Sequence, residues 1–350
     1  GFHGMSLLRL SGLFCALLIF LVIFFRLRRH SESRFDVVIL SVFGIGMLLV
    51  SLFPGLLNLP AEIFSLDKHE RGRLLTLIII SSVVLWLLLI NERGKTRYLT
   101  MGFDRLVRGL AVDRVFNLPA EIPEKPVLII IPAYNEAENL RHVLPALPKN
   151  VMGKSALPLV VDDGSTDNTM QICSQFKIPV ARNIINRGGG AALRAGFDIA
   201  LDINARAIVT MDGDGQHRIE DIETLVEPIL NDSADLVVGS RMLGEMERYS
   251  RLRYWGVVLF GRMISVILGR RVTDPASGFR AFGPAVLESC LMVQDQYHTA
   301  ELIIEAAKRD LRIVERPIVI KKRISGQSKK GKNFKYALYF LRTILRTWVR

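Results

Sequence analysis

VLIIIPAYNEAENL, residues 127–140, is the first of two stretches that decide the fold, and LPLVVDDGSTDNT, residues 157–169, is the second. Each begins with a short apolar run rich in β-branched residues, which predicts a buried strand. Each then turns polar and continues in a helical pattern, from Glu138 in the first and from Asn168 in the second. A strand followed by a helix and another strand is the unit from which parallel sheets are built.

The same alternation continues along the chain. Further short apolar runs lie at residues 179–182, 207–212 and 234–240, with helical patterns from about Gly190 and from Ile219. Residues 122–330 are therefore predicted to form an α/β domain with a Rossmann-like, mostly parallel sheet that is covered on both faces. Ligands of such sheets bind beyond the carboxyl ends of the strands. The polar motifs YNE, DDGS, DGDGQ and SR follow the predicted strands there.

The first ninety residues have a different character. The chain is 50% hydrophobic, with a mean hydropathy of +0.29, and apolar runs at residues 7–25, 37–59 and 74–90 account for much of this. Runs of this length predict membrane-crossing helices, so we expect a transmembrane region over residues 5–92. Pro54 and Gly55 interrupt the second run, which leaves two spans and a re-entrant segment as the alternative.

Basic residues set the expected orientation. They flank the first run at residues 26–34 and follow the third at residues 93–108, and slightly fewer lie between the second and third runs. Basic loops favour the cytoplasmic side. We therefore expect an integral membrane protein whose α/β domain is cytoplasmic. Residues 93–121 predict an amphipathic linker helix, either on the membrane or packed against the next domain.

The carboxyl-terminal residues are strongly basic. Residues 321–350 contain ten Lys or Arg and no acids, interleaved with aromatic and aliphatic residues. This pattern over residues 331–350 predicts a basic amphipathic helix on anionic membrane lipids. Nucleic-acid binding is the rival interpretation, but no recognition module accompanies the helix, so no nucleic-acid partner is expected. The net charge of +12 indicates anionic ligands such as phosphates.

MDGDGQH, residues 211–217, carries the strongest chemical signal. Asp212 and Asp214 follow a predicted strand, and the adjacent glycines allow a tight turn that brings both carboxylates to one point. Hard divalent cations prefer oxygen ligands and retain substrate phosphate oxygens. Gln216 could add another oxygen. An EF-hand loop is the rival, but its required glycine is replaced by His217; a solvated acidic turn is the plain alternative.

The second acidic motif is VVDDGSTDNT, residues 160–169. Asp162 or Asp163 could accept a hydrogen bond from a ring N–H of a base such as uracil or guanine. The hydroxyl, carboxylate and amide side chains of residues 165–168 are better suited to capping the next helix.

Taken together, the motifs have a specific order. They read IIPAYNEAEN, VVDDGSTDNT, NRGGGAALRAG, MDGDGQH, VGSR, DPASGFRAF, HTAELIIEAAK and RISGQSK. This set resembles the family 2 glycosyltransferases of the GT-A fold, in the branch of dolichyl-phosphate mannose synthases and polyprenyl-phosphate glycosyltransferases. The resemblance implies inverting, metal-dependent transfer of one hexose from GDP-mannose, UDP-glucose or UDP-GlcNAc to dolichyl or polyprenyl phosphate. A homo-oligomer is compatible with it.

The resemblance also implies roles for the matching residues. Those expected to bind the nucleotide-sugar are Pro132, Tyr134, Glu136, Asp162, Asp163, Asp212, Gly213, Asp214 and Lys329. Those expected to hold Mg²⁺ or Mn²⁺ are Asp212, Asp214 and Gln216. Those expected at the acceptor phosphate are Arg241, Ser277 and Arg280. Those expected to act in catalysis are Asp214, Arg280, Arg323 and Glu301.

Two of these positions need comment. Glu301 could orient the acceptor site or a neighbouring arginine, or it could be a charge favoured by the dipole at a helix amino terminus. Gly189 departs from the family pattern, which has a lysine at this position.

The proposed acceptor explains the arginines. A phosphate monoester is mostly dianionic at neutral pH and needs little help from a base. When this dianion approaches the donor diphosphate, cationic side chains must offset the repulsion between the two anions. Arginine can do so with a planar guanidinium group that matches phosphate oxygens. Two alternatives remain. A processive polysaccharide synthase is expected to have a QxxRW motif and later spans, which this sequence lacks. A membrane scaffold or flippase partner with an inactive domain would not need Asp212, Asp214 and Gln216.

Overall fold

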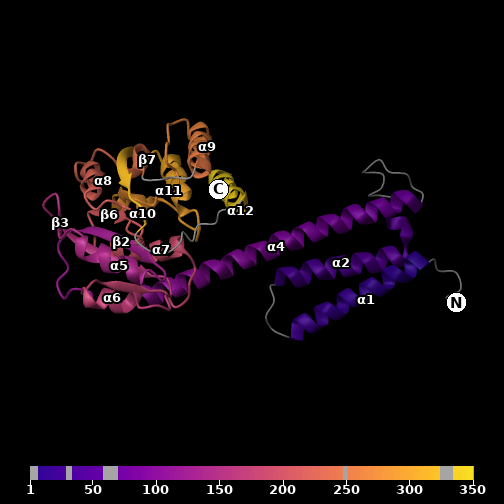
Figure 1. The fold of residues 1–350 in the computed structure, drawn as a ribbon. Coiled ribbons are helices and arrows are strands. Elements are labelled where there is room, and N and C mark those ends of the chain that lie inside the picture. The colour runs from indigo at the N-terminus through magenta and orange to yellow at the C-terminus, as the bar shows by residue number, and fades with distance from the viewer. Residues whose placement is uncertain (1–6, 29–33, 58–69, 247–250, 324–333, 350) are drawn as a thin grey trace. The chain divides into compact units, whose positions relative to one another are not determined.

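The computed structural model describes residues 7–28, 34–57, 70–246, 251–323 and 334–349. It divides into two compact units, residues 1–102 and 103–350 (Figure 1). The elements in chain order are α1 (Leu7–Arg28), α2 (Arg34–Leu52), η1 (Pro54–Leu57), α4 (Glu70–Val112), β1 (Val115–Phe116), β2 (Val127–Ala133), α5 (Ala137–Val143), η2 (Leu144–Ala146), β3 (Asn150–Val151), β4 (Lys154–Asp162), α6 (Thr169–Gln175), β5 (Val180–Arg182), α7 (Gly189–Asp202), β6 (Ala207–Thr210), α8 (Asp221–Leu230), β7 (Leu236–Met246), α9 (Arg251–Leu268), β8 (Arg280–Phe282), α10 (Pro284–Ser289), α11 (His298–Lys308), β9 (Ile313–Ile320) and α12 (Phe334–Val349).

The first unit is helical. The described parts of the three apolar runs are mainly helical, and α1 packs along α2. Small residues permit this approach, since a Cβ on Gly44 would lie 3.1 Å from Ile19. Large apolar side chains remain exposed on these helices, among them Phe14, Val42 and Trp86. Within the described ranges, no helix combines the length and the apolar content needed to cross a bilayer, so the predicted spans are not found there.

Helix α4 joins two segments that the sequence separates. It contains both the third apolar run and most of the predicted amphipathic helix. In its last turns, Val107 and Ala111 are buried in the core of the second unit. Leu106 and Leu110 are exposed on the other side. The last turns of α4 therefore pack within the second unit and also have exposed apolar side chains.

The second unit contains the predicted mostly parallel sheet. The strand order is β1-β5-β4-β2-β6-β8-β7-β9, with β3 paired to β4. The pairs β2–β4, β2–β6, β4–β5 and β7–β9 are parallel. Strand β8 lies between β6 and β7 and is antiparallel to both. The five predicted strands are present; β1, β3, β8 and β9 are additional.

Both faces of this sheet are covered by helices. Along β2, Leu128 and Ile130 face one core cluster, and Val127, Ile129 and Ile131 face the other. The first cluster receives side chains from α7, α9, α11 and α12, and the second from α5, α6 and α8. A strand buried on both faces is expected to be apolar throughout, which explains the unbroken run in β2.

Polar segments converge at one edge of the sheet. The carboxyl ends of β2, β4, β6, β7 and β9 lie there because these strands run in the same direction. Strand β8 runs the other way, with Arg280 paired to both Thr210 and Val238. Its amino end therefore meets the same edge. This brings residues 273–279 beside the motif at 211–217.

Helix α12 only partly matches the predicted membrane-surface helix. Phe340 and Ile344 are buried in the core, and the Phe340 ring lies 4.6 Å from that of Phe260 on α9. Leu345 and Trp348 remain exposed beside basic residues. One face of the helix thus packs in the protein core, and the other exposes basic and apolar side chains.

Candidate active site

The acidic turn after β6 is built as the sequence predicts. Gly213 is buried against β2 and α5, where a Cβ would lie 3.2 Å from Ile131 and from Leu140. Gly215 has a φ of 75°, a conformation that favours glycine. Asp214 accepts a hydrogen bond from the Gln216 N–H at 3.1 Å. Burial and the neighbouring Asp212 carboxylate raise the pKa of Asp214. The pair therefore resists double ionisation, and a bound cation would relieve this cost.

These residues fit a divalent cation. The described part of the chain contains no group of three or more His, Cys, Asp and Glu that could enclose a metal. Two carboxylates are nevertheless sufficient for Mg²⁺ or Mn²⁺ when substrate phosphates and water complete the shell. Gln216 donates its side-chain N–H to the Lys321 carbonyl at 3.1 Å, which fixes its amide next to the turn. The metal role of Asp212, Asp214 and Gln216 stays a prediction, and the donor set agrees with it.

Arg323 joins the two acidic motifs. Its Nη2 donates to both carboxylate oxygens of Glu136, at 2.6 and 2.8 Å. Its Nη1 lies 3.7 Å from Oδ2 of Asp214. A guanidinium group that pairs with two carboxylates can also bind phosphate oxygens, because both present oxygens in a similar geometry. Pro132 lies in β2 and Tyr134 and Glu136 follow it; Pro132 and Tyr134 are half-buried. Lys329 lies outside the described residues.

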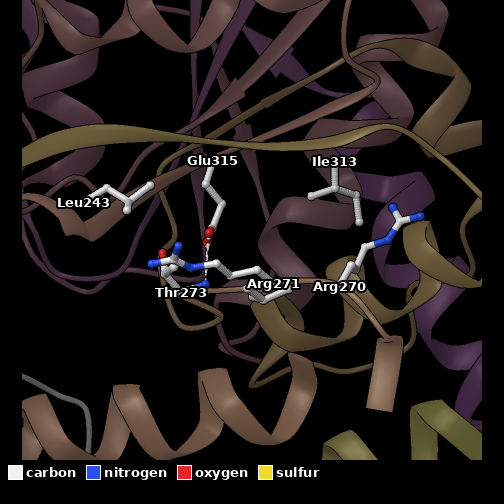
Figure 2. Close-up of a pocket in the computed structure, with 7 residues that line it drawn as sticks. Leu243, Arg270, Arg271, Thr273, Ile313 and Glu315 are labelled. Atoms are coloured by element: carbon white, nitrogen blue, oxygen red, sulfur yellow. Dashed lines mark hydrogen bonds between the residues drawn. The ribbon is translucent and has the colours of Figure 1, made fainter. Parts of the chain in front are cut away.

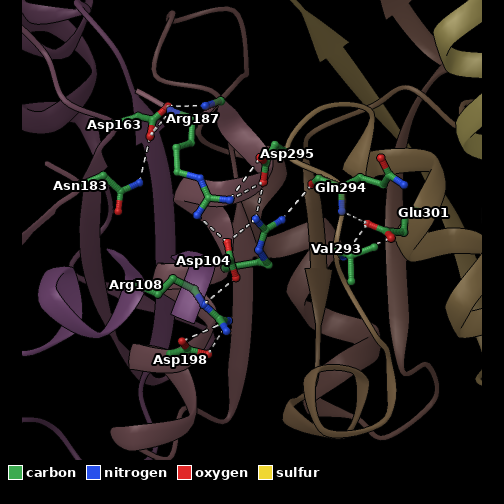
Figure 3. Close-up of polar contacts among 12 residues, drawn as sticks. Asp104, Arg108, Asp163, Asn183, Arg187, Asp198, Val293, Gln294, Asp295 and Glu301 are labelled. Carbon is green, nitrogen blue, oxygen red and sulfur yellow. Dashed lines mark hydrogen bonds and ion pairs between the residues drawn. The ribbon is translucent and has the colours of Figure 1, made fainter. Parts of the chain in front are cut away.

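The two aspartates of the second motif are used by the protein itself. Both are buried. Asp163 accepts hydrogen bonds from Asn183 Nδ2 at 2.9 Å and from the backbone N–H groups of Arg187 and Gly188 at 3.1 and 2.6 Å (Figure 3). Burial outweighs these bonds and raises its pKa. Asp162 accepts the Ser165 N–H at 2.9 Å. This geometry favours loop-holding roles over the predicted contact with a base.

An ion-pair cluster continues from that loop. Arg187 and Arg194 each lie 2.7 Å from the same oxygen of Asp104, on α4, and both also pair with Asp295 (Figure 3). Burial alone would raise the pKa of Asp104, but its arginine partners outweigh burial and hold the pKa below its ordinary value. The loop beneath the predicted nucleotide site is therefore anchored to α4.

Glu301 lies in the first turn of α11, as the helix-charge interpretation requires, and it also makes contacts that the sequence did not predict. Its side chain is fully buried in the first turn of α11. Its carboxylate accepts the backbone N–H groups of Val293 at 3.1 Å and Gln294 at 2.9 Å. The next residue, Asp295, accepts the Gly190 N–H at 2.8 Å through its carbonyl. Glu301 therefore holds the segment against which α7 begins, and the structure favours this role over a contact with the acceptor.

The residues predicted for the acceptor phosphate are mostly occupied. Arg241 makes two hydrogen bonds of 2.6 Å to the buried carboxylate of Asp274. Ser277 is buried. Arg280 is buried and donates to the carbonyls of Ser277, Thr299 and Pro275. Burial lowers its pKa to about 9, so it remains a cation at neutral pH. Arg280 therefore holds this loop together, and its predicted place at the acceptor phosphate is not favoured.

Arginines for which the sequence predicts no role line two cavities together with Thr273. Figure 2 shows Arg270 and Arg271 at a cavity of about 170 Å³ beside Thr273 and Glu315. A larger cavity of about 710 Å³ adjoins it along α9 and includes Arg262 together with apolar side chains. Thr273 lines both cavities, and its backbone N–H is held by Glu315 at 2.9 Å. We call the two cavities together the arginine groove.

A short segment connects this groove to the acidic turn. Thr273 lies in the groove, and five residues later a Cβ on Gly278 would lie 3.2 Å from Oδ1 of Asp212. The Gly278 carbonyl also accepts a hydrogen bond from Thr210 Oγ1 at 2.8 Å. The groove and the carboxylates therefore share one loop.

Sequence reasoning missed several of these residues. His217 and Asp274 lie inside quoted motifs but carry no predicted role, although His217 directly follows Gln216. Arg187 and Asp104 are 83 residues apart in the sequence, and no local pattern connects them.

Comparison with known proteins agrees with this arrangement. The model of the family described as Glycosyl transferase family 2 matches residues 128–291. The UDP-N-acetylglucosamine–dolichyl-phosphate N-acetylglucosaminyltransferase of Methanococcus voltae is 32% identical, over 56% of this chain and 85% of that protein. The polyprenol monophosphomannose synthase of Mycolicibacterium smegmatis is 31% identical, over 63% of this chain and 88% of that protein.

A solved structure supports the fold. Glucosyl-3-phosphoglycerate synthase from Mycobacterium tuberculosis, in complex with Mn²⁺, UDP and its product, superposes with a TM-score of 0.51 at 21% identity. The match covers 64% of this chain and 80% of that one. At this identity the likeness shows the fold, and the α/β unit is GT-A-like with a mostly parallel sheet.

Proposed function

This chain belongs to glycosyl transferase family 2 and is a glycosyltransferase, and from that premise we propose that it transfers one hexose from a nucleotide-sugar to a polyprenyl phosphate. One observation carries the proposal. The carboxylates of Asp212 and Asp214 lie at the same sheet edge as Arg323, and residues 273–278 lead from them into the arginine groove. A donor diphosphate and an anionic, apolar acceptor can thus be bound side by side. Relatives named for dolichyl and polyprenyl acceptors add support.

The donor side needs charge neutralisation. Asp212 and Asp214 would hold Mg²⁺ or Mn²⁺, and the ion when bound would offset the negative charge that develops on the departing nucleoside diphosphate. Arg323 would exchange a carboxylate partner for phosphate oxygens and remain in place through its other partner. Its two partners, Glu136 and Asp214, come from different strands, so it is already oriented across the site.

The acceptor side needs cations and an apolar wall. In the arginine groove, Arg262 and Arg271 lie beside Tyr254, Val258 and Val266 of α9. The acceptor phosphate is largely a dianion at neutral pH. One of its oxygens would attack the anomeric carbon directly; the new C–O bond forms as the bond to the diphosphate breaks, and the anomeric configuration inverts. No protein base is required for this step.

We also propose that the protein acts at a membrane, with the catalytic unit on the cytoplasmic side. Exposed apolar side chains on α1, α2 and α4 support this, as does the basic and apolar outer face of α12. A polyprenyl acceptor would be delivered from the same bilayer.

The test is a transfer assay with the full chain in detergent. Purified protein is incubated with Mn²⁺, a short polyprenyl phosphate and either GDP-mannose, UDP-glucose or UDP-GlcNAc. We expect nucleoside diphosphate release with one donor, dependent on both metal and lipid phosphate. Asp214→Asn should lower turnover by at least about 100-fold with an unchanged melting temperature, in line with the loss of a transition-state charge stabiliser.

Asp232→Asn is the matched control, because this exposed carboxylate pairs with Arg206 and lies outside the site. It should retain normal turnover. Release of nucleoside diphosphate without the lipid would contradict the proposed acceptor. No release with any donor would favour a non-catalytic scaffold, and long polysaccharide products would favour a processive synthase.

A further inference from the structure

His217 is buried, and its imidazole makes no hydrogen bond to the described residues. Its side chain is 6% exposed, and neither ring nitrogen has a hydrogen-bond partner among the residues that the structure describes. The ring lies against Phe279, with centroids 4.6 Å apart. Its backbone forms an isolated bridge with Ile320 of β9. The position is thus fixed from two sides while the imidazole itself is unpaired.

The nearest charged group is a proposed metal ligand. Nε2 of His217 lies 3.8 Å from Oδ2 of Asp212, slightly beyond hydrogen-bond distance. A Cβ built on Gly278 would lie 3.2 Å from Oδ1 of the same carboxylate. One oxygen of Asp212 is therefore close to the imidazole and the other is close to a glycine.

An unpaired buried imidazole lowers stability, and buried polar groups in native proteins are nearly always paired. Packing alone does not require a histidine here, because an apolar ring would contact Phe279 equally well. An exception of this kind beside a carboxylate indicates that the partner is acquired when the site is filled. Carboxylates that bind metals are themselves usually held by hydrogen bonds from the surrounding protein.

We propose that His217 is a positioning residue for the cation site: its Nε2–H donates to the Asp212 carboxylate when that carboxylate binds a divalent cation, and so fixes the orientation of this ligand. The inference rests on the proposed function, since it assumes that Asp212 and Asp214 hold the cation. It assigns a role to a residue that neither contacts the sugar nor takes part in bond making.

The test measures Mn²⁺ binding to the full chain in detergent, by electron paramagnetic resonance of free Mn²⁺, with no donor present. His217→Phe keeps the ring contact with Phe279 and removes both nitrogens. We expect its Mn²⁺ affinity to fall about 10- to 100-fold, the usual effect of losing such a supporting hydrogen bond. Its metal-free melting temperature should equal or exceed that of the wild type, because two unpaired buried nitrogens are gone. His217→Gln, which keeps an N–H donor, should recover part of the affinity.

The controls separate the possible failures. Asp214→Asn should abolish Mn²⁺ binding, and Asp232→Asn should leave it unchanged. If Asp214→Asn binds Mn²⁺ normally, or the wild type binds none, the cation site itself is wrong and the proposed function fails with it. If Asp214→Asn loses binding while His217→Phe keeps it, only the role of His217 is wrong. A ¹⁴N coupling to bound Mn²⁺ that disappears in His217→Phe would overturn positioning in favour of direct ligation.

Discussion

Gly190 lies in the first turn of α7, directly against the segment that Glu301 holds. A Cβ at this position would be 2.2 Å from the Gln294 carbonyl oxygen and 2.8 Å from that of Asp295. Both obstacles are backbone atoms, and the Asp295 carbonyl already accepts the Gly190 N–H. At Gly189 the nearest atom to an added Cβ is 3.7 Å away. Two adjacent glycines therefore have very different tolerance for a side chain.

We expect Gly190→Ala to lower the free energy of unfolding by about 2 kcal/mol or more, as overpacking against backbone does. Gly189→Ala should be neutral or slightly stabilising, because alanine is favoured over glycine in helices by about 1 kcal/mol. Urea unfolding of both variants measures the difference. Equal midpoints would mean that the 294–295 segment moves freely, contrary to its contacts with Glu301.

At single residues, sequence reasoning succeeded where chemistry is local. Asp212, Asp214 and Gln216 could be grouped because they share one turn, and the turn has its expected form. It did not foresee that Asp163 and Arg280 form hydrogen bonds with backbone groups 25 and 19 residues away in the sequence. An arginine in a polar motif has the same pattern whether it binds a phosphate or three carbonyls. Only the tertiary fold distinguishes the two.

The last turns of α4, which belong to the second unit, are held within it by ion pairs. Asp104 pairs with Arg187 and Arg194, and Arg108 pairs with Asp198. The pKa of Asp104 is lowered in the folded protein, so its contribution to stability is present above its unfolded pKa of about 3.9. That contribution is lost as the pH falls through the lower, folded value.

Asp104→Asn should therefore lower the free energy of unfolding at pH 7 by roughly 2 kcal/mol, the scale of a charged hydrogen bond. The difference from the wild type should shrink below about pH 4, where the wild-type carboxylate also takes up its proton. Asp198→Asn is the comparison, because burial raises the pKa of Asp198. Its ionised form is disfavoured in the folded protein, so the substitution should cost little at pH 7. Urea unfolding from pH 3 to 7 measures the free energy of unfolding of both variants. If the loss of stability in Asp104→Asn were the same at every pH, the ion-pair explanation would be ruled out.

Among the elements, the strands that form apolar runs before a polar turn were predictable, and β1, β3, β8 and β9 were not. β2, β4 and β6 are apolar runs bounded by polar turns. β8 has three residues, and β9 carries Glu315, Arg316 and Pro317 in its middle, which argue against a strand. Helix α4 was divided in the prediction because the charged residues 92–97 end the apolar run. Most of them are good helix formers, so the helix continues through them.

For the molecule as a whole, the exposed apolar side chains of the first unit predict association with membranes. Phe14, Val42 and Trp86 are each more than 60% exposed. Several such residues on neighbouring helices are costly in water and favoured in a bilayer. We expect the full chain to sediment with membranes, to resist extraction by alkaline carbonate, and to dissolve in detergent.

The control is a wash with concentrated salt, which screens the attraction of basic residues to anionic lipid. Release by salt alone would show binding through the basic surface, including α12, and would contradict insertion of the first unit. Recovery in the soluble fraction without any treatment would exclude both forms of attachment.

At this scale the sequence was informative about the family and the fold, because a set of motifs in fixed order constrains many positions at once. The choice of sugar and of base was not predictable. Both depend on the shape of a pocket that several loops form together, and the aspartates expected to recognise the base are engaged with backbone groups and neighbouring side chains.

Strand β8 runs antiparallel to both of its neighbours, and under the proposed function this direction would let one short peptide line both substrate sites. Residues 273–279 enter the strand from the catalytic edge, with Thr273 in the arginine groove and Gly278 next to Asp212. If the proposed acceptor and cation sites are correct, lipid preference and metal binding depend on the same peptide. Grafting this peptide from a homologue to change the acceptor would then also change the surroundings of the cation, so that the two would have to be optimised together.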